Sequence, residues 1–257
     1  MNAAPPVVIE RHGQIATLRL QRPPVNAIER SLCEALIAAL DELEADSEVL
    51  GIVFAGRPGL FSAGLDLPAL LALDRAEMRA FWYAFVAVFL RLYATPLCVV
   101  AAIEGHAPAG GTVLAITADH RVAADGDFRI GLNEVAVGLA VPPFLCLVAV
   151  ALLGQRNAER LLTTGTLLTP QEALAVGFVD EVVAADAVFA RAQAVLRARV
   201  ALPQMARRET KRLLRAPFAA AIAGGLDSEV DTFLDFWFQD QCQRELQRVI
   251  ASLAKRR

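Results

Sequence analysis

Two features between residues 103 and 134 could carry chemistry: a turn of small residues and a single carboxylate. Gly110 and Gly111 lack the Cβ atoms that keep ligands away from the backbone, and they open a predicted helix. The first N–H groups of a helix have no acceptor within it, so they can bind a negatively charged oxygen. Glu134 closes the stretch and offers a carboxylate that could move a proton. Taken alone, these residues also fit an ordinary glycine turn before a helix. The choice between a binding site and a plain turn depends on the rest of the sequence.

Composition narrows the class of protein. The chain has 257 residues, of which 56% are hydrophobic, and a mean hydropathy of +0.45, as expected for a packed globular protein. Its net charge of -3 argues against a nucleic-acid-binding surface. The N-terminus lacks the pattern of a signal or transit peptide, so we expect a cytoplasmic protein. Four scattered cysteines without CxxC or Cys/His spacing predict reduced core thiols and neither a metal site nor a disulfide framework: Cys33, Cys98, Cys146 and Cys242.

The elements around this stretch predict an α/β fold. Short apolar runs at Val49–Ala55 and Leu97–Ile103 indicate strands buried on both faces, and the apolar spacing after Ser31 indicates an amphipathic helix. Strand, loop and helix alternate repeatedly, which predicts parallel strands whose loops share one edge of a sheet. We therefore divide the chain into an α/β core with the active site, residues 1–186, and a helical region expected to serve oligomerisation, residues 187–257.

One uncharged run, residues 135–154, imitates a membrane span. It is long enough to cross a bilayer, but Pro142 and Pro143 disrupt helical hydrogen bonding near its middle. The continuous part, Phe144–Leu153, has the length of a buried core helix. We therefore expect no insertion into a membrane.

Two groups of residues in the C-terminal region need a role. One helix is basic, and both a solvated face and a phosphate-contacting surface stay open for its residues: Arg207, Arg208, Lys211, Arg212 and Arg215. The other group is more apolar than a free tail should be, which predicts packing on the protein's own core or on a neighbouring subunit. Its residues are Val230, Phe233, Leu234, Phe236, Trp237 and Phe238.

Three motifs in order carry a resemblance to a known family. They are Phe61-Ser62-Ala63-Gly64-Leu65-Asp66-Leu67, Pro108-Ala109-Gly110-Gly111 and Ile130-Gly131-Leu132-Asn133-Glu134. Together they resemble the enoyl-CoA hydratase/isomerase (crotonase) family, and they look most like its Δ3,Δ2-enoyl-CoA isomerase (dodecenoyl-CoA isomerase) subgroup. The resemblance extends over nearly the whole chain. It implies a crotonase-like spiral of ββα units with a C-terminal helical region, assembled as a homotrimer or a dimer of trimers.

The resemblance also implies roles for residues. The backbone N–H groups of Ala63 and Gly110 would form an oxyanion hole, which stabilises the enolate made when a proton leaves the carbon beside a thioester carbonyl. Asp66 has a competing role as the N-cap of a helix. The substrate would be a fatty acyl-CoA, so CoA enters as part of the substrate, and neither a cofactor nor a metal is expected. Substrate contacts are implied for Ala63, Gly64, Leu65, Asp66, Leu67, Gly110 and Asn133.

Two acid positions separate the reactions of this family. Its hydratases carry two glutamates, and by motif position one falls on Val113 and the other on Glu134. A single carboxylate favours an isomerase of fatty acid β-oxidation, in which Glu134 takes a proton from C2 of a 3-enoyl-CoA and returns it at C4 to give 2-trans-enoyl-CoA. Apolar neighbours at Val135, Val137 and Leu139 should raise the pKa of Glu134 towards its working pH.

Other functions stay open at this point. An enoyl-CoA hydratase or another acyl-CoA enzyme would differ in its product, and a protein of this fold that has lost catalysis could bind acyl-CoA or RNA. A serine hydrolase is excluded, because Leu60 stands where the Gly-x-Ser-x-Gly motif around Ser62 requires glycine. The aromatic helix between Phe81 and Phe89 fits either a plain core or the wall of a hydrophobic pocket. His106 lies in the glycine loop, but the expected chemistry does not require it.

Overall fold

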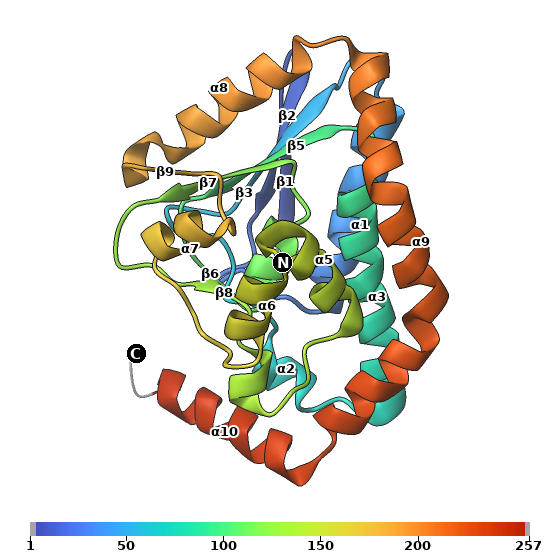
Figure 1. The fold of residues 1–257 in the computed structure, drawn as a ribbon, viewed down its shortest axis with the longest axis vertical. Coiled ribbons are helices and arrows are strands. Elements are labelled where there is room, and N and C mark those ends of the chain that lie inside the picture. Colours follow the sequence, from blue (N-terminus) through green and yellow to red (C-terminus); the bar gives the residue numbers. More distant parts are fainter. Residues whose placement is uncertain (1–3, 255–257) are drawn as a thin grey trace.

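The strands of the protein form two sheets (Figure 1). The computed structural model describes residues 4–254, and within them the larger sheet has the order β1-β2-β3-β5-β7-β9 and the smaller sheet the order β4-β6-β8. β1 pairs antiparallel with β2, and the pairings between the other named strands are parallel. The strands are β1 (Val7–His12), β2 (Ile15–Leu20), β3 (Gly51–Ala55), β4 (Gly59–Leu60), β5 (Cys98–Ile103), β6 (Gly105–Pro108), β7 (His120–Ala124), β8 (Ile130–Gly131) and β9 (Glu181–Val183).

Strands of the two sheets alternate along the chain. β3 is followed by β4, β5 by β6 and β7 by β8, so each repeat adds one strand to the larger sheet and one short strand to the smaller. Each pair leads into helical structure, and this arrangement confirms the predicted spiral of ββα units and its parallel α/β core. The helices that follow the three pairs are α2 (Leu67–Leu70) with α3 (Arg75–Ala94), α4 (Gly110–Ala115), and the 3-10 helix η1 (Glu134–Val137) with α5 (Pro143–Leu153).

Helices cover both faces of the larger sheet (Figure 1). α8 (Val188–Val200) packs on β3, β5 and β7 and buries Val188, Ala192 and Leu196 there. The alternate residues of the same strands face a larger core that also takes in α1 (Arg30–Ala45), α3 and the long α9 (Gln204–Trp237). The remaining helices are α6 (Gln155–Leu162), α7 (Pro170–Val176), η2 (Ala185–Ala187) and α10 (Asp240–Ala254).

Side-chain caps fix where several helices begin. Asp66 accepts a hydrogen bond from the backbone N–H of Ala69 at 3.3 Å and starts α2, as predicted. Asp74 and Glu77 form a reciprocal capping box at the start of α3. α3 thus begins at a defined residue and presents its aromatic side chains to the core.

The apolar residues between 230 and 237 belong to α9, and most of them face the protein's own core, while Phe238 follows the helix and is exposed. Phe233 stacks on Trp82 of α3 with ring centroids 3.5 Å apart, and Trp237 is fully buried. Of the two predicted alternatives, packing on the protein's own core is confirmed for these residues, because α3 covers them. The division of the chain at residue 186 stays a prediction.

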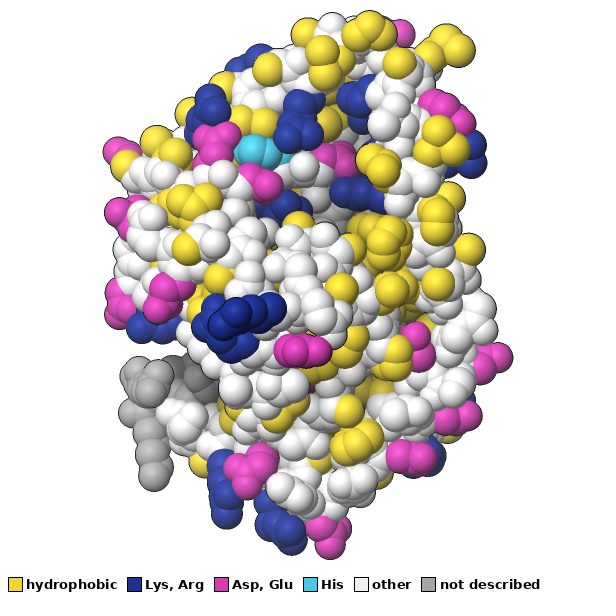
Figure 2. Space-filling view, viewed as in Figure 1, with side chains coloured by type: hydrophobic (Ala, Val, Ile, Leu, Met, Phe, Trp, Pro, Cys, Tyr) yellow, Lys and Arg dark blue, Asp and Glu magenta, His cyan; other side chains and the backbone are white. Residues whose placement is uncertain are grey.

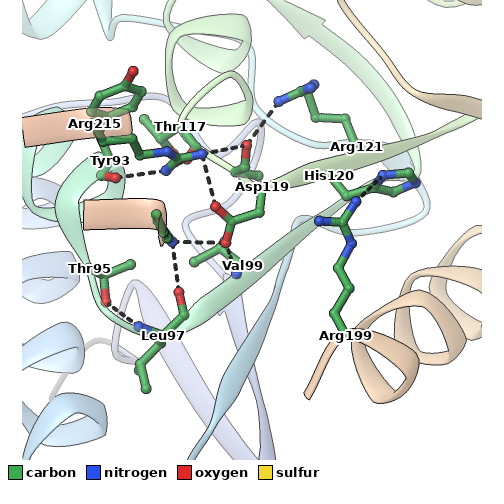
Figure 3. Close-up of polar contacts among 12 residues, drawn as sticks. Tyr93, Thr95, Leu97, Val99, Thr117, Asp119, His120, Arg121, Arg199 and Arg215 are labelled. Carbon is green, nitrogen blue, oxygen red and sulfur yellow. Dashed lines mark hydrogen bonds and ion pairs between the residues drawn. The ribbon is translucent and has the colours of Figure 1, made fainter. Parts of the chain in front are cut away.

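The basic residues at the start of α9 do not all form a solvated face. Lys211 Nζ donates to the Asp119 carboxylate at 2.8 Å and to the carbonyl oxygen of Leu97 at 2.8 Å. Arg215 contacts the same carboxylate at 2.9 Å and donates to the carbonyl oxygen of Tyr93 at 2.7 Å (Figure 3). Because Asp119 directly precedes β7, these contacts attach α9 to the amino ends of β5 and β7.

The uncharged run around the two prolines forms a core helix, as predicted. It is α5, which has 11 residues and buries Phe144, Leu145 and Val148. In the described part of the chain, no helix combines the length and the apolar character needed to cross a membrane.

Candidate active site

The smaller sheet brings the three motifs to one edge. β4, β6 and β8 are parallel neighbours, and each is followed directly by one motif. Residues 61–67 follow β4, Ala109 and Gly110 follow β6, and Asn133 and Glu134 come shortly after β8. The carboxyl ends of parallel strands meet at the same edge of a sheet, where ligands commonly bind. Residues far apart in the sequence therefore share one candidate site.

Two of the motifs approach each other more closely than side chains would allow. A Cβ on Gly110 would lie 3.2 Å from Gly64 Cα and 2.9 Å from Ile28 Cδ1. A Cβ on Gly111 would lie 2.6 Å from the carbonyl oxygen of Ser62. The backbone of Ser62 therefore leaves no room for a side chain at residue 111, and at residue 110 a side chain would press on Ile28 and Gly64.

The first oxyanion donor is not Ala63, contrary to the prediction. Its backbone N–H donates to the carbonyl oxygen of Val25 at 3.0 Å, so it is not free to bind a ligand. Gly64, with a φ of 86°, turns the chain, and the N–H of Leu65 then donates to no acceptor among residues 4–254. The N–H of Gly110 is equally free, and the Leu65 nitrogen lies 3.4 Å from the position of a Cβ on Gly110. The neighbouring pair of free donors is therefore Leu65 and Gly110.

Backbone strain precedes the second donor. Ala109 has φ 48° and ψ -121°, a region that residues with a side chain rarely occupy. Its N–H donates to the Gly131 carbonyl oxygen at 2.8 Å, while Thr112 Oγ1 accepts from the Gly131 N–H at 2.8 Å. Strain of this kind persists where the surroundings fix it, and it is common at functional sites. These contacts also tie the Gly110 turn to the strand that leads to Glu134.

One oxygen of the Glu134 carboxyl group, Oε2, is buried without a hydrogen-bond partner among the described residues. Burial raises the pKa of Glu134 to about 7 from an ordinary value of 4.5, and its own backbone N–H lowers it only in part. The predicted rise in pKa is confirmed. Of the predicted apolar neighbours, Val135 is 41% exposed and does not shield Glu134 from water. Leu139 is buried, and α10 packs on η1, the helix that begins at Glu134.

The structure also places the other predicted residues. Val113 is buried in α4 and offers no second acid. The Asp66 carboxylate caps α2 and pairs with Arg22 at 2.8 Å, so it is already occupied. His106 accepts the Arg129 backbone N–H at its Nδ1 atom, a structural contact. The remaining predicted substrate contacts lie in the loops at this edge and stay predictions: Gly64, Leu65, Leu67, Gly110 and Asn133.

Sequence reasoning missed two parts of the site. The free donor at Leu65 depends on the turn made by Gly64, which the motif alone did not reveal. The second part is the segment from Arg22 to Ile28, which bonds repeatedly to residues 61–66, the oxyanion loop. The signal in the sequence was Asn26, which follows two prolines. Asparagine adopts a positive φ more readily than most residues, and Asn26 has a φ of 48°.

Comparison with known proteins agrees with this geometry. Residues 10–253 match the family model described as enoyl-CoA hydratase/isomerase. Enoyl-CoA delta isomerase 1, mitochondrial, of Rattus norvegicus is 35% identical over 255 residues, which cover 98% of this chain and 88% of the relative. A probable enoyl-CoA hydratase of Mycobacterium avium (strain 104) is 32% identical over 227 residues, covering 87% of this chain and 88% of the relative. The crystal structure of human mitochondrial delta3-delta2-enoyl-CoA isomerase has a TM-score of 0.95 at 35% identity, over 98% of this chain and 99% of that chain.

A spiral of ββα units with two free backbone donors at the edge of its smaller sheet defines the crotonase-like class of proteins. The match over residues 10–253 and the full-length relatives agree with that class. The chain belongs to the enoyl-CoA hydratase/isomerase family.

Proposed function

We propose that this chain is a Δ3,Δ2-enoyl-CoA isomerase, which converts 3-enoyl-CoA into 2-trans-enoyl-CoA. The observation that carries the proposal is a contrast between two positions: the Oε2 atom of the Glu134 carboxyl is buried without a partner among residues 4–254, and Val113 supplies no second acid. Adding water to a double bond asks for one group to activate the water and another to help deliver the proton. Moving a double bond needs only one group that takes a proton and returns it.

The geometry supports a two-step proton transfer. The N–H groups of Leu65 and Gly110 hold the thioester oxygen, and the Glu134 carboxylate takes a proton from C2. The electron pair of the broken C–H bond enters a dienolate, whose negative oxygen the two donors stabilise. Glu134, now protonated, returns the proton at C4, and the double bond lies between C2 and C3. A base with a pKa of about 7 suits both steps near neutral pH, because it can accept a proton and release it again.

The relatives support the substrate class. Two of them are named as enoyl-CoA delta isomerases, and a structure with a TM-score of 0.95 is titled as a delta3-delta2-enoyl-CoA isomerase. In this proposal CoA enters as part of a fatty acyl-CoA substrate, and the reaction uses no separate cofactor. The isomerase would serve fatty acid β-oxidation, where unsaturated chains have to be brought into conjugation with the thioester.

An enoyl-CoA hydratase is the second candidate, because the relative from Mycobacterium avium is named as a probable enoyl-CoA hydratase. A hydratase would convert a 2-enoyl-CoA into a 3-hydroxyacyl-CoA. The two candidates therefore differ in both substrate and product.

The decisive assay supplies 3-enoyl-CoA and 2-enoyl-CoA thioesters of several chain lengths. We expect the ultraviolet absorbance of a conjugated thioester to grow from the 3-enoyl substrates. Replacing Glu134 by Gln removes the base and should lower kcat by about 10² to 10⁴-fold. Formation of 3-hydroxyacyl-CoA as the main product would favour the hydratase, and full turnover by Glu134→Gln would remove Glu134 from the mechanism.

Assembly as a homotrimer or a dimer of trimers belongs to the same proposal. Apolar side chains are exposed over the upper part of α9 in Figure 2, and Met205, Leu213 and Leu214 are among the exposed large hydrophobic residues of that helix. Exposed apolar surface of this kind commonly marks a contact between proteins. Light scattering tests it, because a stable monomer would contradict the trimer. A cytoplasmic location stays a prediction, which cell fractionation would test.

A further inference from the structure

A turn of residues 22–27, of which Asn26 and Ala27 are buried, lies against the oxyanion loop, and the proposed reaction has not yet given it a role. Asn26 closes this turn: its backbone N–H donates to the Arg22 carbonyl oxygen at 2.7 Å, and its Oδ1 accepts from the Arg22 N–H at 2.9 Å. Asn26 is 1% exposed and has a φ of 48°. Asparagine tolerates this left-handed conformation better than most residues, because its short side chain bonds locally. Asn26 is therefore the buried side chain that closes the turn, and the guanidinium groups of Arg22 and Arg57 bond to it from its more exposed side, at the carbonyl oxygens of Ala27 and Pro24.

Asn26 and its neighbour Val25 also bond to the oxyanion loop. Asn26 Nδ2 donates to the carbonyl oxygen of Phe61 at 3.0 Å, and the hydroxyl of Ser62 donates to the carbonyl oxygen of Asn26 at 2.7 Å. The Ala63 N–H donates to the Val25 carbonyl oxygen at 3.0 Å. Three successive residues of the loop are thus bonded to the turn. Buried polar groups held in this way are costly to release.

The next residues fix the peptide that carries the free donor. The Ile28 N–H donates to the Gly64 carbonyl oxygen at 2.8 Å, and the Asp66 N–H donates to the Ile28 carbonyl oxygen at 2.9 Å. The Gly64 carbonyl and the Leu65 N–H belong to one planar peptide unit and point in opposite directions in its trans form. Bonding the carbonyl to Ile28 therefore aims the Leu65 N–H the other way, towards the Gly110 side.

We propose that Asn26 is a positioning residue of the oxyanion hole: it holds the 22–27 turn against residues 61–63 and so sets the direction of the Leu65 N–H. The inference rests on the proposed function, because that reaction defines the oxygen to be bound. Asn26 does not touch the reacting atoms. Its loss leaves the Phe61 carbonyl and the Arg22 N–H unpaired and lets the loop shift, and a misplacement of about 1 Å at a reacting centre costs about a hundredfold in rate.

The test compares Asn26→Gly with Asn157→Gly. Glycine keeps the positive φ of residue 26 available, so this variant removes the side-chain contacts without adding backbone strain. Asn157 is the matched control: it is a partly buried asparagine on α6 whose Nδ2 donates to the Leu153 carbonyl oxygen at 3.1 Å. Asn26→Asp is a second variant that keeps the acceptor for the Arg22 N–H and changes the group facing Phe61.

Two measurements separate positioning from stability. The first is the split between kcat and KM with 3-enoyl-CoA: we expect Asn26→Gly to lower kcat by about tenfold to a hundredfold with KM little changed. The second is the infrared C=O stretch of a saturated acyl-CoA labelled with 13C at the thioester carbon. Bound to the wild type, this band should shift to lower wavenumber than in water, because the oxyanion hole polarises the carbonyl.

The outcomes are distinct. The proposal expects the bound C=O band of Asn26→Gly and Asn26→Asp to return towards its position in water, while Asn157→Gly loses stability and keeps both the band and kcat. Asn26 variants that keep the wild-type band and kcat, even with a lower Tm, would overturn it. A wild type that shows the shifted band but does not isomerise any 3-enoyl-CoA would instead refute the proposed function and leave the positioning role measurable from the band.

Discussion

Asp119 and Glu134 are both carboxyl groups held away from water, but their surroundings differ. Asp119 accepts hydrogen bonds from Lys211 Nζ and the Val99 N–H, each at 2.8 Å, and pairs with Arg215 at 2.9 Å (Figure 3). Burial by itself would raise its pKa, yet the two cations and the backbone N–H lower the pKa of Asp119 below its ordinary value. The Oε2 atom of Glu134 has no partner among residues 4–254, and burial raises its pKa to about 7.

The difference shows how the same side-chain chemistry serves two purposes. A buried carboxylate that is surrounded by donors stays ionised and holds segments together, and Asp119 joins α9 to the amino ends of β5 and β7. A buried carboxyl without donors is easily protonated and released again near neutral pH. Glu134, beyond the carboxyl end of β8, is therefore suited to move a proton, and its ionised form lowers stability instead of adding to it.

The largest effect on stability is expected from Asp119→Ala. This change leaves Lys211 and Arg215 buried beside each other without their anion, which should cost about 3 to 5 kcal/mol in the free energy of unfolding. Denaturant unfolding measures that loss. Activity per folded molecule should stay at the wild-type level, because Asp119 lies away from the loops that carry the site.

Glu209→Ala provides a control for Asp119→Ala. Glu209 pairs with Arg212 on the surface of α9, where water screens the charges, so we expect only a small change in stability. Equal losses for the two variants would mean that burial does not distinguish the Asp119 cluster from an ordinary surface pair.

Glu134→Gln should act in the opposite direction and raise stability at alkaline pH. The pKa of Glu134 is raised on folding, so its contribution to stability is fully present below the unfolded value of about 4.5 and is lost as the pH rises through about 7. At pH 8 the wild type bears the cost of a buried unpaired anion, on the order of 3 kcal/mol. Unfolding curves at pH 5 and pH 8 should show a gain for Glu134→Gln at pH 8 only.

A gain of the same size at pH 5 would point to better packing of the amide and not to relief of charge. A loss at pH 8 would show that Glu134 has partners in solution after all. Either result would weaken the contrast with Asp119.

Much of the fold followed from local patterns in the sequence. The short apolar runs predicted β3 and β5, the two prolines placed the start of α5, and Asp66 was correctly expected to cap α2. These features depend on neighbours in the sequence, so a pattern is enough to find them. Glu134 was found from its motif, which is local, although its burial also depends on α10, a segment far along the chain that packs on η1.

The errors and the open alternatives all depend on contacts between distant segments. Ala63 was assigned as an oxyanion donor from its motif, but its N–H donates to the carbonyl oxygen of Val25, on another loop. The free N–H in this motif is that of Leu65. For the aromatic residues of α9 the sequence left the protein's own core and a neighbouring subunit open, and only the contact with α3 decided for the core. Lys211 looked like part of a solvated face, because its partner Asp119 lies 92 residues away in the sequence. Spacing within one element does not reveal such pairings.

The most direct test of this account is a titration of the two carboxyl groups by NMR, with 13C-labelled Asp and Glu carboxyl carbons. Glu134→Gln and Asp119→Asn would assign the two signals. We predict that the Glu134 signal titrates with a midpoint near pH 7, while the pKa of Asp119 lies below the ordinary value of an aspartate. A Glu134 midpoint at the ordinary value of about 4.5 would contradict it, because the carboxyl would then be solvated or paired and would not be the poised base of the site.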